Sequence, residues 1–302
     1  MHMKQLLVTI AALYSTQAWA HPIGGHHHAN PWLQLLQDYW VALPVGLALV
    51  LYLAGLYRMT RKIGRPTSDA PMRAKAFLLA WLTLVVALFS PVDTLGNAYF
   101  SMHMVQHELL MIVAAPLFVM ARPLPMWAWA VPGAAAKVGK TTSSPGFSHF
   151  WRLLTNPLSA WTIHAGVLWG WHVPELFEMA LHYSLVHDLQ HLSFFFSALL
   201  FWWSLMRLSN TRSPAVSGLV SLFTTALHTA LLGALLTFSS RVWYHSYIIP
   251  AGSLELALQD QQLGGLIMWI PGGMAYLVVA LAICYRLLST GAQDRPLARR
   301  TG

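Results

Sequence analysis

The chain contains seven long apolar stretches, each about the length of a membrane-spanning helix. A bilayer core of about 30 Å requires roughly 20 helical residues. Only 9% of the 302 residues are charged and 56% are hydrophobic, whereas a soluble domain is about 25% charged. The sequence therefore predicts an all-α, polytopic membrane protein whose membrane domain, residues 38–288, is a bundle of seven transmembrane helices. The apolar stretches are Tyr39–Tyr57, Ala74–Phe89, Ala98–Ala121, Leu158–Val173, Ser184–Met206, Val216–Phe238 and Gln262–Leu287.

The basic side chains lie in alternate loops, which predicts the orientation of the helices. Lys and Arg accumulate on the cytoplasmic side of membrane proteins, so we expect the mature N-terminus outside and residues 289–302 as a cytoplasmic tail. The formal net charge of +8 therefore comes from basic residues in the cytoplasmic loops and gives no indication of nucleic-acid binding. We expect the aromatic segment Pro125–Val131 at the membrane interface, followed by a Gly-, Ser-, Thr- and Lys-rich linker. The basic loop residues are Arg58, Arg61, Lys62, Arg65, Arg73, Lys75, Arg122, Lys137, Lys140, Arg152, Arg207 and Arg212.

The N-terminus has the layout of a cleavable secretory signal peptide. Lys4 precedes a short apolar core at Leu6–Leu13, and Ala18-Trp19-Ala20 matches the A-x-A cleavage pattern. Cleavage of residues 1–20 agrees with an external N-terminus and with a multi-pass protein of the bacterial plasma (inner) membrane. Residues 21–37 would form a periplasmic tail, either a plain polar segment or a segment that captures copper. Its histidines are His21, His26, His27 and His28.

Two pairs of histidines with helical spacing fall at one predicted depth. His103 and His107 lie in the first turns of the third apolar stretch, and His187 and His191 lie in the first turns of the fifth. Both stretches enter the membrane from outside. Residues at i and i+4 are neighbours on a helix, so each pair can direct two ring nitrogens at one ion. The spacing therefore predicts a metal site in the outer leaflet, on the periplasmic side.

His172 and Asp260 reach the same level from two other apolar stretches. His172 is a candidate fifth ligand, and Asp260 or Glu108 is a candidate partner for a ring N–H. Ionisable groups in a membrane span are functional candidates because burying them unpartnered costs several kcal/mol. A polar network without metal is the alternative for the two histidine pairs. His164 and His228 lie nearer the bilayer middle and fit an interhelical hydrogen bond as well as a ligand role.

Copper is the metal that the ligand types favour. Cys284 is the one cysteine, so no thiolate cage is available. Imidazole suits copper and thioether selects Cu(I), and Met111 continues the histidine stripe of the third stretch at i+4. Core packing is the better explanation of Met102 and Met104.

Catalytic motifs are mostly incomplete. The segment HELLM, which begins at His107, lacks the second histidine of the zinc-protease motif HExxH, and HDLQH at His187–His191 carries Asp where the general base would be Glu. There is no GxSxG, no phosphate loop and no dinucleotide fingerprint. We therefore expect a protein that is not an enzyme, with a zinc hydrolase as an open alternative.

Several segments resemble the CtaG-type, polytopic cytochrome c oxidase assembly factors. They are SPVD at Ser90–Asp93, HMVQH at His103–His107, WHVPELFEMAL leading to HDLQH, LLFWW in the fifth stretch and DQQLGGLIMWIPGG in the seventh. The resemblance implies a membrane protein needed for oxidase maturation through copper. An unrelated single-span copper chaperone shares the family name, and its cysteine site has no counterpart here. The candidate site residues implied by the resemblance are His103, His107, His187, His191, Asp93 and Asp260.

The hypothesis from the sequence is a metallochaperone that binds Cu(I) or Cu(II) at the outer-leaflet histidines and delivers it to a cytochrome c oxidase subunit. A periplasmic copper donor and membrane lipid are further candidate partners. A b-type haem protein is one alternative, with axial ligands from two helices such as His103 and His187. A zinc-dependent intramembrane hydrolase is the other, with the HDLQH pair and Asp260 activating water.

Overall fold

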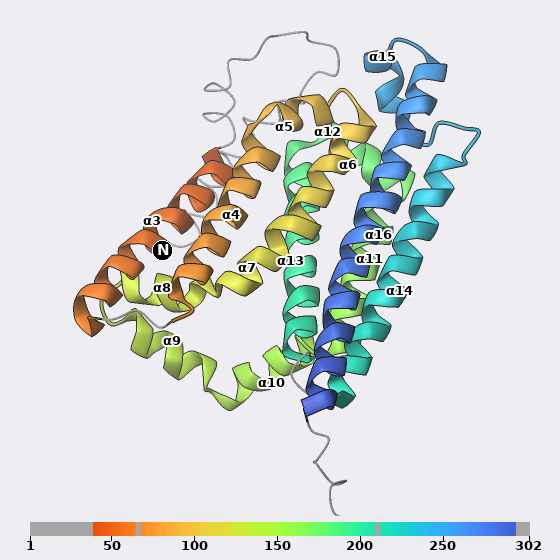
Figure 1. The fold of residues 1–302 in the computed structure, drawn as a ribbon. Helices are drawn as coiled ribbons and strands as arrows, with labels where there is room; N and C mark the ends of the chain where they lie inside the picture. The colour runs from red at the N-terminus through yellow and green to blue at the C-terminus, as the bar shows by residue number, and fades with distance from the viewer. Residues whose placement is uncertain (1–38, 65–67, 209–211, 294–302) are drawn as a thin grey trace, which may run out of the picture.

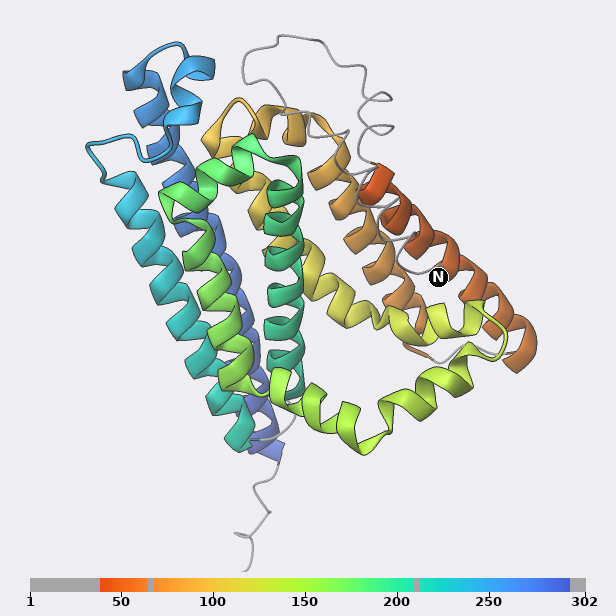
Figure 2. The same ribbon diagram turned by 180° about the vertical axis from the view of Figure 1, so that it is seen from behind.

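The computed structural model describes residues 39–64, 68–208 and 212–293, and every regular element in these ranges is helical. Long helices stand side by side and short helices lie at their ends (Figures 1 and 2). The predicted signal peptide, the His-rich tail and most of the predicted cytoplasmic tail lie outside the described residues. The helices are α3 (Tyr39–Ile63), α4 (Ala70–Phe89), α5 (Pro91–Gly96), α6 (Phe100–Glu108), η1 (Leu109–Ala114), α7 (Ala115–Ala121), α8 (Pro123–Ala130), α9 (Ala134–Thr142), α10 (Pro145–Leu154), α11 (Pro157–Trp171), α12 (Pro174–His182), α13 (Ser184–Leu208), α14 (Arg212–Thr237), η2 (His245–Tyr247), α15 (Ile248–Ala251) and α16 (Leu254–Gln293).

Six helical segments among the described residues are long and apolar enough to cross a membrane, which confirms a multi-pass membrane protein. The fourth predicted span corresponds to α11, which has only 15 residues and is short of the roughly 20 that a bilayer requires. It nevertheless packs against α13 and α14. The count of seven spans therefore stays a prediction. The six segments are Tyr39–Ile63, Ala70–Phe89, Phe100–Ala121, Ser184–Arg207, Val216–Thr237 and Leu254–Ser289.

Successive long helices run in opposite directions, so the loops fall into two groups at opposite ends of the bundle. The short helices α8, α9 and α10 lie at the end where α16 finishes, and α5, α12 and α15 lie at the other end (Figure 1). The first group belongs to the loops in which the sequence carries its basic residues. We refer to the two ends as the basic end and the α12 end.

A π-helical turn interrupts the third span. The segment η1 separates α6 from α7, and Pro116 follows it at the start of α7. Proline has no N–H and its ring clashes with the carbonyl one turn earlier, so a wider turn before Pro116 relieves the crowding. The carbonyl oxygen of Met111, inside this turn, accepts a hydrogen bond from Trp202 Nε1 of α13 at 2.9 Å. The interrupted helix is thus fixed to α13.

The segment after the third span is helical: its aromatic part forms α8, and the Gly-, Ser-, Thr- and Lys-rich part expected as a linker forms α9 and the start of α10. Its first helix, α8, packs along α3. Trp127 Nε1 donates to the carbonyl of Ala48 at 2.9 Å, and the Arg58 guanidinium donates to the carbonyl of Ala130 at 2.7 Å. Gly55 lies where the two helices come closest, because a Cβ at this position would overlap the backbone carbonyl of Met126.

We predict that Gly55→Ala lowers the free energy of unfolding by about 1–3 kcal/mol, the usual cost of overpacking, because only a backbone shift could make room for the methyl group. Gly46→Ala is the matched control on the same helix, since nothing lies within 4 Å of its Cβ position. Thermal unfolding of the detergent-purified protein, followed by tryptophan fluorescence, compares the two. Equal midpoints for both variants would contradict the close approach of α3 and α8.

Candidate metal centre

Four histidines from α6 and α13 form one cluster. Ring centroids are 4.4 Å apart for His103 and His107 on α6, and 4.2 Å apart for His187 and His191 on α13. Between the helices, His103 is 5.4 Å from His187 and 5.7 Å from His191, and His107 is 5.3 Å from His191. The predicted meeting of the two i, i+4 pairs is confirmed. One nitrogen each from His103, His187 and His191 lie within 4.8 Å of one another, so these three residues could hold a metal ion.

The cluster is buried, and several of its nitrogens lack hydrogen-bond partners. His103, His107 and His191 are 0%, 2% and 8% exposed. Among the described residues, no hydrogen bond of normal geometry reaches either ring nitrogen of His103 or His107, or Nε2 of His191. The Gln190 side chain and the Gly96 backbone are near His103 without completing such a bond. An unpaired buried polar group costs about 1–3 kcal/mol and requires an explanation such as a bound ion or water. The donor set therefore fits a metal ion.

Aromatic rings cover the cluster toward the α12 end. The Phe177 ring of α12 is 5.1 Å from the His103 ring and 4.1 Å from the Tyr244 ring. Phe100, the first residue of α6, is 4.9 Å from Tyr244 and 5.9 Å from Tyr247. These rings exclude water from the histidines, and exclusion of water strengthens the electrostatic interactions of any ion among them.

Two tyrosine hydroxyls fasten this aromatic cover to the helices below. Tyr244 donates to the carbonyl of His172, and Tyr247 donates to the carbonyl of Gly96, each at 3.0 Å. Burial raises the pKa of both tyrosines, and the nearby Glu178 carboxylate raises it further. Both hydroxyls therefore stay protonated and remain hydrogen-bond donors.

His172 is held in the tautomer that a metal ligand needs. Its Nδ1 lies 2.7 Å from the carbonyl oxygen of Leu168. A carbonyl only accepts, so Nδ1 carries the proton and Nε2 carries the lone pair, and Nε2 has no partner among the described residues. The ring lies 6.3 Å from Phe177 and 6.1 Å from Phe194, two rings that also contact the α6 histidines. The role of His172 as a fifth ligand stays a prediction.

Asp260 binds the start of α6. Its carboxylate accepts from the main-chain N–H of Phe100 at 2.6 Å and from the main-chain N–H and the hydroxyl of Ser101. The first N–H groups of a helix have no partner within the helix, and a negative charge there is favourable. The contacts of Asp260 thus assign it to positioning α6, one turn before His103, and its role as a ligand or ring partner stays a prediction.

Asp93 contacts α6 through a hydrogen bond with Gln106. Gln106 is fully buried, and its Nε2 donates to the Asp93 carboxylate and to the carbonyl of Ala87, both at 2.8 Å. Gln106 precedes His107, so these bonds fix the rotation of α6 about its axis. A direct ligand role for Asp93 stays a prediction.

Met111 is 3% exposed and lies in the aromatic core with Trp202. Its expected position beside the histidines assumed a regular α-helix, whereas the π-helical turn begins two residues earlier at Leu109. The wider turn changes the register, so the i+4 argument no longer supports Met111 as a ligand, and core packing accounts for its burial. Its ligand role stays a prediction without geometric support.

Sequence reasoning missed one polar neighbour of the cluster, and the role of another stays a prediction. Gln190 is fully buried beside His103, and its i+3 spacing from His187 could have revealed it. Glu108 was a candidate partner for a ring N–H, but it faces α16, where a Cβ at Gly272 would lie 3.1 Å from its Oε2.

Fold and site together define a multi-pass, all-helical membrane protein with a buried histidine cluster able to hold a metal ion. Residues 50–290 match the model of the cytochrome c oxidase caa3 assembly factor family (Caa3_CtaG). The chain therefore belongs to this family.

Curated relatives come from mycobacteria. The chain is 28% identical over 240 residues to uncharacterized protein Mb0105 of Mycobacterium bovis and to uncharacterized protein MT0111 of Mycobacterium tuberculosis. It is 26% identical over 238 residues to uncharacterized protein ML1998 of Mycobacterium leprae. Each match covers 74% of this chain and 35% of the relative, so the chain spans about a third of the length of these proteins. No solved structure matches the chain significantly.

We predict that Asp260→Ala destabilises the protein by about 0.5–2 kcal/mol, the usual cost of losing a helix cap, because it leaves the N–H groups of α6 unpaired. Asp260→Asn keeps an acceptor and should recover part of the loss. Glu255→Ala is the control, because Glu255 is an exposed acid in the first turn of α16, the helix that also carries Asp260. The measurement is the thermal midpoint of the purified protein. An Asp260→Ala variant as stable as the control would show that the cap is dispensable.

Proposed function

We propose that this protein binds copper at the α6–α13 histidine cluster and delivers it to a cytochrome c oxidase subunit during assembly of the oxidase. The observation that carries the proposal is the convergence of His103, His187 and His191, whose nitrogens lie within 4.8 Å of one another. Family membership supplies the oxidase as the destination.

The proposed topology is a seven-helix bundle with the N-terminus outside and the C-terminus in the cytoplasm. The alternating helices and the basic residues of one set of loops support it. In this orientation the histidine cluster lies in the outer leaflet and faces the periplasm of the bacterial inner membrane. With α11 as the fourth span, its 15 residues require a locally thinned bilayer or ordered flanking turns.

Ligand geometry favours copper over haem. A haem held by His103 and His187 would place a flat macrocycle between rings whose centroids are 5.4 Å apart, while His191 contacts both of them. A small ion fits this arrangement, and imidazole nitrogens suit copper.

Zinc also accepts three imidazoles, but a zinc hydrolase needs a base to activate water. Asp260, the carboxylate proposed for that task, bonds to the start of α6 instead. Copper delivery is therefore the better-supported function.

Transfer follows from the presence of a fourth imidazole. His107 is in ring contact with His103 and His191, so an ion held by three rings can exchange ligands one at a time. Imidazole ligands release Cu(I) more readily than thiolates, which soft copper prefers. His21, His26, His27 and His28, outside the described residues, are proposed to capture periplasmic copper for the cluster.

Anaerobic titration of the purified full-length protein with Cu(I), against a chromophoric chelator, tests the copper site. We expect His187→Ala/His191→Ala to abolish copper binding at the cluster, an effect larger than the about 10- to 100-fold loss typical for outer-shell changes. His182→Ala is the matched control, because His182 is exposed on α12. Full copper binding by the double variant, a Soret band, or zinc alone on isolation would sink the proposal.

In cells, we expect deletion of the gene to lower cytochrome c oxidase activity and the copper content of the enzyme. The wild-type protein should restore both, the His187→Ala/His191→Ala variant should not, and added copper should restore part of the activity. The His182→Ala variant serves again as the control. Normal oxidase activity and copper content in the deletion strain would contradict a role in copper delivery.

A further inference from the structure

A second histidine pair lies where α11, α13 and α14 pack together. His164 of α11 is 1% exposed, and its ring stacks on Phe201 of α13 at 5.3 Å. His228 of α14 lies 5.7 Å from the ring of Trp161, which is one turn from His164 on α11. The two histidines are thus linked through the Trp161 side chain where α11 packs against α14. They therefore share one buried interface.

Hydrogen bonds fix the tautomer of His164. Its Nδ1 lies 3.1 Å from the Ser197 hydroxyl oxygen, and that hydroxyl donates its single hydrogen to the carbonyl of Phe194, also at 3.1 Å. Ser197 can then only accept from His164, so Nδ1 carries the proton and Nε2 carries the lone pair. Nε2 is buried and has no hydrogen-bond partner among the described residues. A ring fixed through Nδ1 with a bare Nε2 is the arrangement of a metal-binding histidine.

His228 does not complete an ordinary interhelical hydrogen bond. Both of its ring nitrogens are buried and neither has a partner among the residues that the structure describes, and the same holds for Nε1 of the neighbouring Trp161. A purely structural pair would use these groups, because leaving them unpaired in a bilayer is costly. The pair instead offers lone pairs to a ligand.

We propose that His164 and His228 form a second Cu(I) site, separate from the α6–α13 cluster. Two neutral imidazoles without a carboxylate suit a soft ion that accepts few ligands, and imidazole suits copper. Ser197 is a positioning residue that sets the tautomer of His164. The choice of copper as the metal rests on the proposed function. The arrangement of the two histidines is independent of that function.

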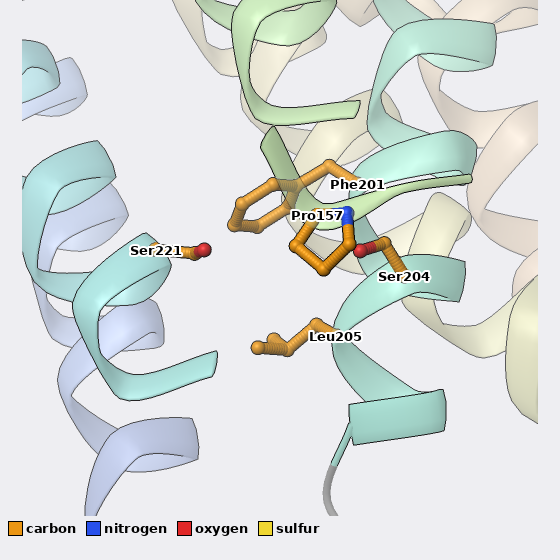
Figure 3. A pocket seen from close by; sticks show the side chains of 5 residues that line it. All are labelled: Pro157, Phe201, Ser204, Leu205 and Ser221. Atoms are coloured by element: carbon orange, nitrogen blue, oxygen red, sulfur yellow. The ribbon is translucent and has the colours of Figure 1, made fainter. Parts of the chain in front are cut away.

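The second site lies between the cluster and the basic end. Ser197 is six residues beyond His191 on α13, a distance of about 9 Å at 1.5 Å per residue. Phe201, which stacks on His164, also lines a narrow crevice with Pro157 and Ser221 (Figure 3). Copper at His164 and His228 would thus occupy a position between that crevice and the histidine cluster.

The main test uses the full-length protein in lipid nanodiscs, titrated anaerobically with Cu(I). We expect wild-type protein to bind two equivalents, and both His187→Ala/His191→Ala and His164→Ala/His228→Ala to bind one. X-ray absorption of the His187→Ala/His191→Ala variant loaded with Cu(I) should give low-coordinate copper with nitrogen ligands only. Size-exclusion chromatography and thermal midpoints identify a variant that fails to fold.

Substitutions at Ser197 test the site without removing a ligand. Ser197→Ala should weaken copper binding at the second site by about 10- to 100-fold, as outer-shell changes do, and Ser197→Thr should restore it by keeping the hydroxyl. Ser193→Ala is the matched control on α13, because Ser193 also bridges a side-chain N–H and a carbonyl, those of Trp171 and Gln190. Both Ser197 variants should leave copper at the cluster unchanged.

The outcomes separate the two proposals. If the wild-type protein binds one equivalent of copper and His187→Ala/His191→Ala binds none, the second site is overturned and the site at the cluster stands. If the wild-type protein binds one equivalent of copper and only His164→Ala/His228→Ala loses it, the second site is supported and the proposed function is overturned. Equal affinity in Ser197→Ala and Ser193→Ala overturns the positioning role of Ser197.

Discussion

The bilayer offers no water to polar groups within it, so each must find a partner in the protein or in a bound ion. Several hydrogen bonds between the helices of this bundle meet that requirement. The start of α6 is capped by Asp260, and a carbonyl in the π-helical turn is taken by Trp202. The bare imidazole nitrogens of His107 and His164 are among the buried polar atoms of the described residues that lack such a partner. They belong to the two places at which we propose that an ion binds.

The sequence predicted those features that depend on local periodicity. Apolar length located the spans, but α3 continues to Ile63 rather than Tyr57, and α16 runs from Leu254 to Gln293 rather than from Gln262 to Leu287. The i, i+4 spacing predicted both histidine pairs, and loop charge predicted that α6 and α13 enter from the same end. Two helices that start at the same end bring His103 and His187 to one level, but the packing that lets the four rings meet depends on tertiary contacts that spacing does not determine.

Features that depend on contacts between distant segments could not be read in this way. The bond between Asp260 and the start of α6 joins residues 160 positions apart, and a carboxylate near histidines was more naturally interpreted as a ring partner. The π-helical turn before Pro116 changes the helix register at Met111, so Met111 does not continue the histidine stripe as a regular α-helix would predict. The aromatic segment Pro125–Val131 was expected only to lie at the membrane interface, whereas close packing at Gly55 and two long-range hydrogen bonds hold its helix, α8, against α3. The Asp260 bond and the α3–α8 contact come from tertiary packing, whereas the turn comes from Pro116 itself.

Phe194 connects the cluster to the second histidine pair. Its ring lies 4.5 Å from the His107 ring, and its carbonyl accepts the Ser197 hydroxyl that fixes His164. Both proposed copper sites include groups of α13 and neither has a thiolate, so neither would hold copper as tightly as a closed cage. Sites of this kind, joined through one phenylalanine, suit a protein that passes an ion on rather than storing it.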